Sequence, residues 1–367
     1  MTERFDMTLF MAWLLALAVG MIMVASASVS LAEHAWFYAS RHGVYLAGGL
    51  CAFAITLAIP LRFWEAVHRP CLLLAILSCA AVLVPSIGHE VNGSRRWISL
   101  GFITLQASEA AKLLLLVYLA GYLSRVRSSL RDDVLVLLRP LGWVGLVLFL
   151  ILLEPDFGTV VVLSILTGGL LFIANARMLH FVLIALVAAS GLVLLAVLQP
   201  YRAERLATFL DPWPFAFGSG YQLTQALIAF GRGEFFGLGL GDGVQKLFYL
   251  PEAHNDFIFA VIAEELGMVG SVLVFGLLMF IVMRVFRVAK DAMVNDRIFP
   301  SYLAYGAGLL IGIQVLINVG VNTGVLPTKG LTLPFISYGG NSLLICSVLM
   351  GLAFRVSHES STRDGRG

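Results

Sequence analysis

Charged residues are scarce in this sequence, and cysteines are few. Asp, Glu, Lys and Arg together make up 13% of its 367 residues, whereas a soluble domain is about a quarter charged. The four cysteines lie inside apolar runs without CxxC spacing: Cys51, Cys71, Cys79 and Cys346. We expect them to be small buried apolar residues, which argues against a disulfide framework and against a cysteine metal site.

The motifs of two large enzyme classes are also missing. No GxxxxGK[ST] segment is present, so nothing in the chain indicates direct use of a nucleoside triphosphate. No HExxH or clustered His/Cys metal signature occurs either. The seven histidines are scattered, and only His254 lies among other candidate functional groups.

Apolar sequence is abundant, since 59% of the residues are hydrophobic and the mean hydropathy is +0.92. This composition indicates an integral membrane protein. We predict an all-α polytopic fold of ten transmembrane helices, forming a single domain over residues 1–367. The approximate bounds of the spans are 8–30, 44–61, 71–88, 105–124, 140–153, 157–174, 180–198, 257–283, 302–322 and 338–354.

The first and fifth spans have unusual features. The first contains 25–27, which resembles a signal-peptidase site, but its apolar run exceeds the roughly 7–15 residues of a signal peptide, so we expect it to stay uncleaved. The fifth would cover only about 21 Å at about 1.5 Å per residue, less than the roughly 30 Å apolar core of a bilayer. We therefore expect the connection 154–158, with Glu154 and Asp156, to be recessed inside the protein.

Basic residues predict the orientation, because cytoplasmic loops carry an excess of Lys and Arg. The majority of the 24 Lys and Arg residues fall on the side of the N-terminus. Both termini are therefore predicted to be cytoplasmic, and the short polar tail at about 356–367 is expected to be disordered. The longest connection, about 199–256, becomes a large extracytoplasmic loop between the seventh and eighth helices.

This loop is expected to be structured. Residues 217–231 look like a glycine-rich entry into a short amphipathic helix, and interleaved aromatic residues favour packing on the membrane surface. A series of glycines follows: Gly231, Gly233, Gly237, Gly239, Gly241 and Gly243. Glycines this dense suit tight turns and a close approach of the backbone to a ligand.

The stretch 247–267 carries the strongest candidate for chemistry, Asp256. His254, Asn255 and Asp256 stand directly before an apolar helical run. One interpretation is that Asp256 only caps that helix. The other is that its carboxylate belongs to a site at the outer membrane surface, with Glu252 and His254 beside it. A helix N-terminus also suits phosphate groups.

Two further charged residues lie within a predicted span. Glu109 and Lys112 stand at positions i and i+3 of the fourth span, so they share a helix face and can neutralise each other. Such a pair indicates either a functional site or a structural ion pair that locks helices together. The sequence leaves both interpretations open.

Basic groups also gather on the outer side. Arg95, Arg96 and Trp97 suit either an aromatic and basic anchor at the membrane interface or a guanidinium site for phosphate with a stacking partner. Lys329 lies in a loop rich in Gly, Pro and hydroxyl residues that is expected to re-enter the membrane. Together with Asp256, these cations suit an anionic, lipid-linked substrate that arrives already activated.

Several motifs of this sequence resemble those of a known family. They include Leu-Pro-Glu-Ala-His-Asn-Asp at 250–256 and Leu-Pro-Thr-Lys-Gly-Leu-Thr-Leu-Pro at 326–334, with further segments at 92–97, 106–112, 155–159 and 218–222. The chain is similar to the SEDS family (shape, elongation, division and sporulation) over nearly its whole length. The two quoted motifs favour the cell-division branch over the elongation branch. Asn255 and Asn341 stand where the family usually carries Thr and Ser.

The resemblance implies a peptidoglycan glycosyltransferase that polymerises lipid II on the outer face of the bacterial cytoplasmic membrane. It implies that Asp256 is the catalytic general base for the 4-hydroxyl of the acceptor sugar, with undecaprenyl pyrophosphate as the leaving group. The residues assigned to the substrate are Arg96, Trp97, Glu109, Lys112, Lys329, Gln222 and His254, with Arg96 on the diphosphate. Oxygen donors available to a divalent cation, Mg²⁺ or Mn²⁺, are Asp256, Glu252 and Asp156.

The resemblance also implies partners and a location. The expected partners are lipid II as substrate, a class B penicillin-binding protein as transpeptidase, and activator subunits of the division complex, with no nucleic acid. The expected location is the division septum, within the inner membrane.

Two other functions remain open from the sequence. A lipid II flippase would also use ten helices and the intramembrane pair Glu109–Lys112. Against it, the sequence shows no inverted repeat, and its most polar cluster lies at the outer surface instead of the midplane. A non-catalytic scaffold that recruits the transpeptidase would need its fold but would not need Asp256.

Overall fold

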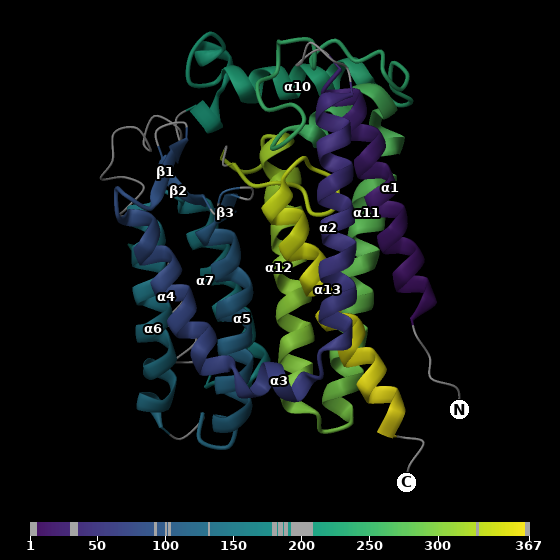
Figure 1. Ribbon diagram of the computed structural model, residues 1–367. Helices are drawn as coiled ribbons and strands as arrows, with labels where there is room; N and C mark the ends of the chain where they lie inside the picture. Colours follow the sequence, from purple (N-terminus) through teal and green to yellow (C-terminus); the bar gives the residue numbers. More distant parts are fainter. Residues whose placement is uncertain are drawn as a thin grey trace.

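The computed structural model describes residues 6–29, 36–91, 94–99, 101, 104–130, 133–177, 182, 186, 190–191, 208–327 and 330–363. Most of them belong to helices that stand side by side in a bundle (Figure 1). Within these ranges, seven helices are long and apolar enough to cross a membrane: α1 (Met7–Ala27), α2 (Phe37–Ala58), α5 (Ala107–Val126), α6 (Val134–Leu153), α11 (Ile258–Val294), α12 (Ile298–Asn322) and α13 (Gly340–Arg363). Two shorter apolar helices are α4 (His68–Leu83) and α7 (Phe157–Ile173).

The prediction of a polytopic helical membrane protein is confirmed. These nine helices coincide with nine of the ten predicted spans. The remaining predicted span, 180–198, lies almost entirely outside the described residues. In the bundle, α11 packs on α12, α13 on α2, and α4 on α5.

Helix α6 is longer than the predicted fifth span, because Pro140 lies inside it and does not begin it. Proline cannot donate to the carbonyl four residues earlier. The hydroxyl of Tyr122 donates to that carbonyl, of Val136, at 2.7 Å. The predicted shortness of this span is therefore wrong, although the connection after it is recessed, since Glu154 and Asp156 are both buried.

A small antiparallel sheet departs from the all-α prediction. Its strands are β1 (Gly88–Val91), β2 (Ser94–Ser99) and β3 (Thr104–Gln106), in the order β1-β2-β3. Trp97 of β2 pairs with His89 on one side and with Gln106 on the other. The predicted third span therefore ends at Leu83 of α4, before the chain enters β1. Strands this short give too few residues for a period-2 pattern to stand out in the sequence.

Helix α11 extends beyond the predicted end at residue 283 and is broken at Gly267. The φ of Gly267 is +68° with ψ −167°, a combination essentially restricted to glycine. The loop before α11 binds this break: the backbone N–H of Leu238 donates to the carbonyl of Glu264 at 3.0 Å, and that of Gly239 to Glu265 at 3.1 Å.

Two glycines of the series allow the loop to lie this close to α11. A Cβ at Gly233 would lie 1.8 Å from the carbonyl oxygen of Ala263, and a Cβ at Gly237 would lie 2.1 Å from that of Glu265. The close approach that the glycines allow is therefore between two backbone segments of the chain. The sequence had suggested tight turns and a close approach of the backbone to a ligand.

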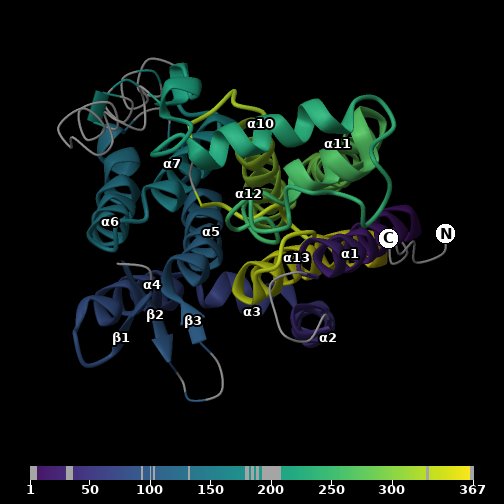
Figure 2. The same cartoon turned by 90° about the horizontal axis from the view of Figure 1, so that it is seen from above.

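The loop contains α10 (Tyr221–Gly233), as predicted, and the short 3-10 helix η1 (Trp213–Phe215). Figure 2 shows α10 lying across one end of the bundle, above α11 and α12. The short helix α3 (Leu61–Ala66) lies at the other end (Figure 1).

The first turn of α1 and the last turns of α13 lie at the end of the bundle away from α10 (Figure 1). Asp6 caps α1 and binds Arg284 of α11 at 2.6 Å. The predicted disorder of the tail is wrong as far as Arg363, because α13 continues to that residue. Arg355, directly before this segment, pairs with Glu359 within it at 2.8 Å.

Candidate active site

Asp256 lies directly before α11, and side chains of α12 hold its backbone. Nδ2 of Asn318 and Nδ2 of Asn322 donate to the carbonyl oxygen of Asp256 at 2.9 and 3.0 Å. Oδ1 of Asn322 also accepts from the backbone N–H of Ala260 at 3.1 Å. The N-cap position is Phe257, and no side chain caps from it. The interpretation that Asp256 serves only as a helix cap is therefore wrong.

The loop before α13 fixes the two residues that precede Asp256. Ser337 Oγ donates to the carbonyl of Asn255 at 2.7 Å, and the backbone N–H of Tyr338 donates to the carbonyl of His254 at 2.9 Å. The ring of His254 lies 4.9 Å from that of Tyr38 in α2 and 5.4 Å from that of Tyr338. Burial lowers the pKa of His254, so this histidine is a neutral member of an aromatic cluster.

The carboxylate of Asp256 accepts no hydrogen bond from the residues that the structure describes. It is partly exposed, and its Oδ2 lies 2.9 Å from where a Cβ on Gly330 would stand. Burial and then the charge of Glu252 raise the pKa of Asp256 to about 7; Arg96 opposes this and Asp156 adds to it. A carboxyl group with a pKa near 7 suits proton abstraction at physiological pH.

Arg96, on β2, faces the turn between α6 and α7. Its Nε donates to the carbonyl of Glu154 at 3.0 Å, and one Nη donates to the carbonyl of Pro155 at 2.8 Å. Its predicted contact with a diphosphate would therefore use the remaining N–H groups. Arg95 points elsewhere and pairs with exposed Glu90 at 3.2 Å.

Asp156 lies in the same turn, but its oxygens are already used. It is the N-cap of α7 and accepts from the backbone N–H of Thr159 at 3.2 Å. Its Oδ2 accepts from Ser108 Oγ at 2.8 Å and from Thr159 Oγ1 at 2.9 Å. Beside it, burial and then the charge of Asp156 raise the pKa of Glu154 to about 8. This turn therefore holds one carboxylate bound to neighbouring donors and one acid that is protonated at neutral pH.

The three carboxylates predicted as donors for a divalent cation do not gather into one site among the described residues. Across the described ranges, no group of three or more His, Cys, Asp or Glu residues could hold a metal. The carboxylate of Asp156 already accepts hydrogen bonds from Ser108 and Thr159, and the side chain of Glu252 is exposed at the surface of its turn. A divalent cation therefore stays a prediction of the family resemblance.

Glu109 and Lys112 form an ion pair at 2.7 Å, and both side chains are buried. Lys112 Nζ also donates to Oε1 of Gln314 in α12 at 2.8 Å. The pair therefore joins α5 to α12. This contact favours the structural interpretation that the sequence had left open.

Three other predicted substrate residues are not seen in contact with Asp256. Trp97 is half-buried in β2, and Gln222 is half-buried in the first turn of α10. Lys329 lies outside the described residues. The first described residue after it, Gly330, is the one that lies beside the carboxylate of Asp256.

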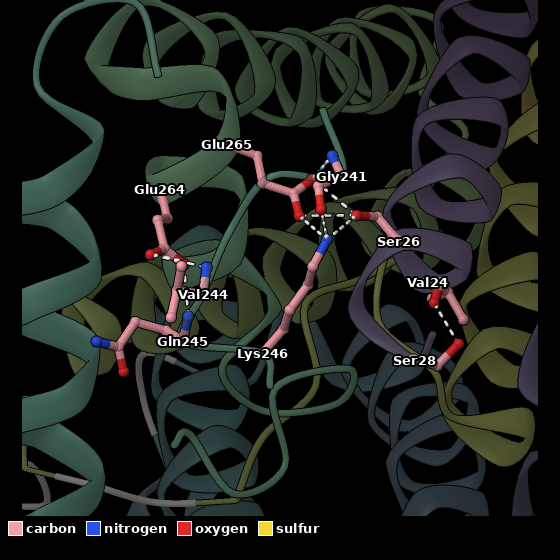
Figure 3. Close-up of polar contacts among 9 residues, drawn as sticks. All are labelled: Val24, Ser26, Ser28, Gly241, Val244, Gln245, Lys246, Glu264 and Glu265. Atoms are coloured by element: carbon pink, nitrogen blue, oxygen red, sulfur yellow. Dashed lines mark hydrogen bonds and ion pairs between the residues drawn. The ribbon is translucent and has the colours of Figure 1, made fainter. Parts of the chain in front are cut away.

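Sequence reasoning missed a buried charged cluster near the break in α11 (Figure 3). Glu265 accepts from Ser26 Oγ of α1 at 2.7 Å and from the backbone N–H of Gly241 at 3.1 Å, and it pairs with Lys246. Its side chain is fully enclosed. Through these bonds, Glu265 of α11 connects α1 with the loop that leads to Asp256.

Glu264, its neighbour, holds the same loop from the other side. It accepts from Arg232 Nε at 3.0 Å and from the backbone N–H groups of Val244 and Gln245 at 3.1 and 3.0 Å. The signal for this cluster was present in the sequence, because two glutamates at the start of an apolar span are as unusual as Glu109 and Lys112.

Comparisons with known proteins agree over nearly the whole chain. The model of the FtsW/RodA/SpoVE family, described as cell cycle protein, matches residues 6–362. A Coxiella burnetii protein named probable peptidoglycan glycosyltransferase FtsW is 47% identical over 360 residues, which cover 97% of each chain. A Halomonas elongata protein of the same name is 50% identical over 368 residues, covering 98% of this chain and 92% of the relative.

Solved structures show the same fold. A chain from a peptidoglycan synthase complex, described as coordinating polymerization and crosslinking, is 30% identical with a TM-score of 0.80, covering 97% of this chain and 98% of that one. The rod shape determining protein RodA of Thermus thermophilus is 28% identical with a TM-score of 0.73, covering 97% of each chain.

Proposed function

This chain belongs to the FtsW/RodA/SpoVE family of cell cycle proteins, and we propose that it is the peptidoglycan glycosyltransferase of septal cell-wall synthesis. Relatives that are 47 to 50% identical over nearly the full length carry that enzyme name. The observation on this chain that carries the proposal is the carboxylate of Asp256. Its backbone is held by Asn318 and Asn322, its oxygens accept no hydrogen bond from the described residues, and its pKa is raised to about 7.

In the proposed reaction, Asp256 accepts the proton of the 4-hydroxyl of the acceptor sugar as that oxygen attacks the anomeric carbon of a lipid-linked donor. The bond from the anomeric carbon to the diphosphate oxygen breaks, and its electron pair leaves with undecaprenyl pyrophosphate. One base with direct displacement inverts the anomeric centre. The activated diphosphate supplies the driving force, in keeping with the absence of a nucleotide-binding motif.

The surrounding residues position this base. General-base catalysis requires a group held within hydrogen-bonding reach of the proton it takes. The backbone bonds to residues 254–256 provide that fixation, and the bonds of Glu264 and Glu265 to the preceding loop support it. Arg96, with its remaining N–H groups, and Lys329 are the proposed cations for the diphosphate.

The partner that we propose is a class B penicillin-binding protein acting as transpeptidase, with activator subunits of the division complex. A structural neighbour that belongs to a complex coordinating polymerization and crosslinking supports this. The names of the relatives support work at the division septum. Residues 1–367 are proposed to act as one domain.

Polymerisation of purified lipid II tests the proposal. The full chain, solubilised in detergent with its transpeptidase partner, is compared with its Asp256→Asn variant, which keeps the size of the side chain but removes the base. We expect glycan from the wild type and a loss of at least about a hundredfold in the variant. Partner binding and thermal unfolding of both proteins serve as the controls for folding.

The same experiment separates the other two functions. Equal polymer from both proteins would disprove the general base. No polymer from either, together with lipid II transfer across liposome membranes, would favour a flippase. Full support of division by Asp256→Asn in cells would favour the scaffold.

A further inference from the structure

A cavity of about 620 Å³ opens between α7, α11 and α12, at the end of the bundle away from Asp256. A volume of this size is typical of pockets that hold small molecules. Its lining is apolar along the helices and charged at one rim: Ile173, Met283, Phe286, Tyr305 and Leu309, with Arg287, Lys290 and Asp291.

The two cations at this rim are available. Arg287 and Lys290 lie one helical turn apart, are exposed, and make no ion pair within 4.0 Å among the described residues. Other arginines at this end differ: Arg284 binds Asp6 at 2.6 Å and Arg127 lies 3.6 Å from Asp296. The rim therefore presents two unpaired cations and one acid above an apolar groove.

The depth of the rim matches a lipid headgroup. The residues on both sides of Gly267, where α11 breaks, are hydrogen-bonded to the loop before α11; the backbone N–H of Met268, for example, donates to the carbonyl of Glu234 at 2.9 Å. At about 1.5 Å per residue, Arg287 lies roughly 30 Å further along the helix, about the thickness of the apolar core of a bilayer. Arg287 and Lys290 are therefore at the level of the opposite leaflet, which the distribution of basic residues predicts to be the cytoplasmic one.

We propose that this groove binds an anionic phospholipid of the inner leaflet. Its phosphate lies between Arg287 and Lys290, and an acyl chain follows Met283, Phe286 and Leu309. Basic pockets between transmembrane helices on the cytoplasmic side suit such headgroups, and the guanidinium of Arg287 can bind phosphate oxygens in pairs. An inorganic phosphate would use only the rim and leave the apolar lining empty, so the groove selects a lipid.

Binding of phosphatidylglycerol to the detergent-solubilised full chain tests this proposal, measured by native mass spectrometry. The double variant Arg287→Gln/Lys290→Gln is expected to lose about tenfold or more in affinity, since each basic residue near an anionic lipid contributes roughly fivefold. Asp291→Asn removes the repelling acid and is expected to tighten binding a few-fold. Both variants change exposed side chains, and equal unfolding temperatures in lipid-free detergent verify that they fold.

The matched control is Arg62→Gln/Arg69→Gln, which removes two exposed arginines at the same end of the bundle but outside the groove. It is expected to bind phosphatidylglycerol like the wild type. Equal losses in both double variants would show a general effect of surface charge and would overturn the proposal. Equal binding of phosphatidylcholine, or equal occupancy by inorganic phosphate alone, would overturn it as well. None of these readouts depends on the glycosyltransferase activity.

Discussion

Two aspartates stand directly before apolar helices in this protein, and the structure uses them in opposite ways. Asp156 caps α7 and accepts from Ser108 and Thr159. Asp256 precedes α11 but does not cap it, because Asn322 of α12 supplies that hydrogen bond. The same sequence context, an Asp before a helical run, thus yields one bound carboxylate and one available carboxylate.

The difference lies in which element provides the hydrogen bonds. The cap of α7 is local, within three residues of chain. The start of α11 is held from a distance, by side chains 62 residues further along the chain. Because side chains of α12 hold the start of α11, the side chain of Asp256 is not needed as its cap. Burial next to Glu252 then raises its pKa to about 7.

The largest test of this comparison replaces each aspartate by alanine. Asp256→Ala is expected to lower lipid II polymerisation at least about a hundredfold, because the base is lost, without lowering the unfolding temperature. Asp156→Ala is expected to destabilise the fold by about 1–2 kcal/mol, because a helix cap and its bonds are lost, with a smaller effect on rate. Polymerisation and thermal unfolding of both variants give the result. If the two variants showed the same profile, the distinction between the aspartates would be wrong.

The second test removes the side chain that releases Asp256. Asn322→Ala deletes two hydrogen bonds to the start of α11 and leaves the partly buried carbonyl of Asp256 with one donor fewer, at a cost of about 1–3 kcal/mol. We expect a loss of roughly tenfold in polymerisation, because the base is misplaced without being removed. The matched control is Thr323→Ala, whose hydroxyl bonds only within its own helix, to the carbonyls of Val319 and Gly320. Loss of activity in the control alone would contradict the assigned role of Asn322.

Long apolar runs made most of the fold predictable. Hydropathy located nine spans to within a few residues at most of their ends, because each helix must be apolar over its whole length. The start of α6 was predicted too late, at Pro140, because proline usually ends or begins a helix. The structure shows that Tyr122 donates to the carbonyl of Val136, which Pro140 leaves without a backbone donor. The short sheet was missed because pairing between strands depends on partners that a single sequence does not identify.

The candidate site was predictable only in part. Asp256 could be found from its neighbours, and its family resemblance added a role. Asn318 and Asn322 were overlooked, although two asparagines four residues apart in an apolar span are a polar stripe on one helix face. Their partners at the start of α11, Asp256 and Ala260, lie 62 to 66 residues away, and a pattern read along the chain does not identify such a pairing. The sequence likewise does not identify Ser26 and Lys246 as the partners of Glu265.

A smaller effect concerns stability and pH. Because the pKa of Asp256 is raised to about 7, above the ordinary value of an aspartate near 4, the folded protein disfavours the ionised carboxylate. The stabilising contribution is complete below about pH 4 and is lost as the pH rises through 7. Asp256→Asn should therefore unfold at a higher temperature than the wild type at pH 8, and the difference should shrink toward pH 5. A variant less stable than the wild type at pH 8 would show that the carboxylate is not penalised by its surroundings.

The smallest expected effect separates burial from charge at Asp256. The rate of polymerisation should rise with pH around a midpoint near 7, because only the ionised carboxylate accepts a proton. Glu252→Gln removes the second cause of the raised pKa while leaving the burial, so the midpoint should move to lower pH by less than about one unit. Glu90→Gln, on an exposed pair with Arg95, is the control and should leave the midpoint unchanged. An unchanged midpoint in Glu252→Gln would show that the charge of Glu252 does not contribute to the raised pKa of Asp256. Loss of a neighbouring negative charge can only favour ionisation of Asp256, so it cannot raise the midpoint. A midpoint that moves to higher pH in Glu252→Gln would therefore mean that Glu252 acts through a contact with the substrate.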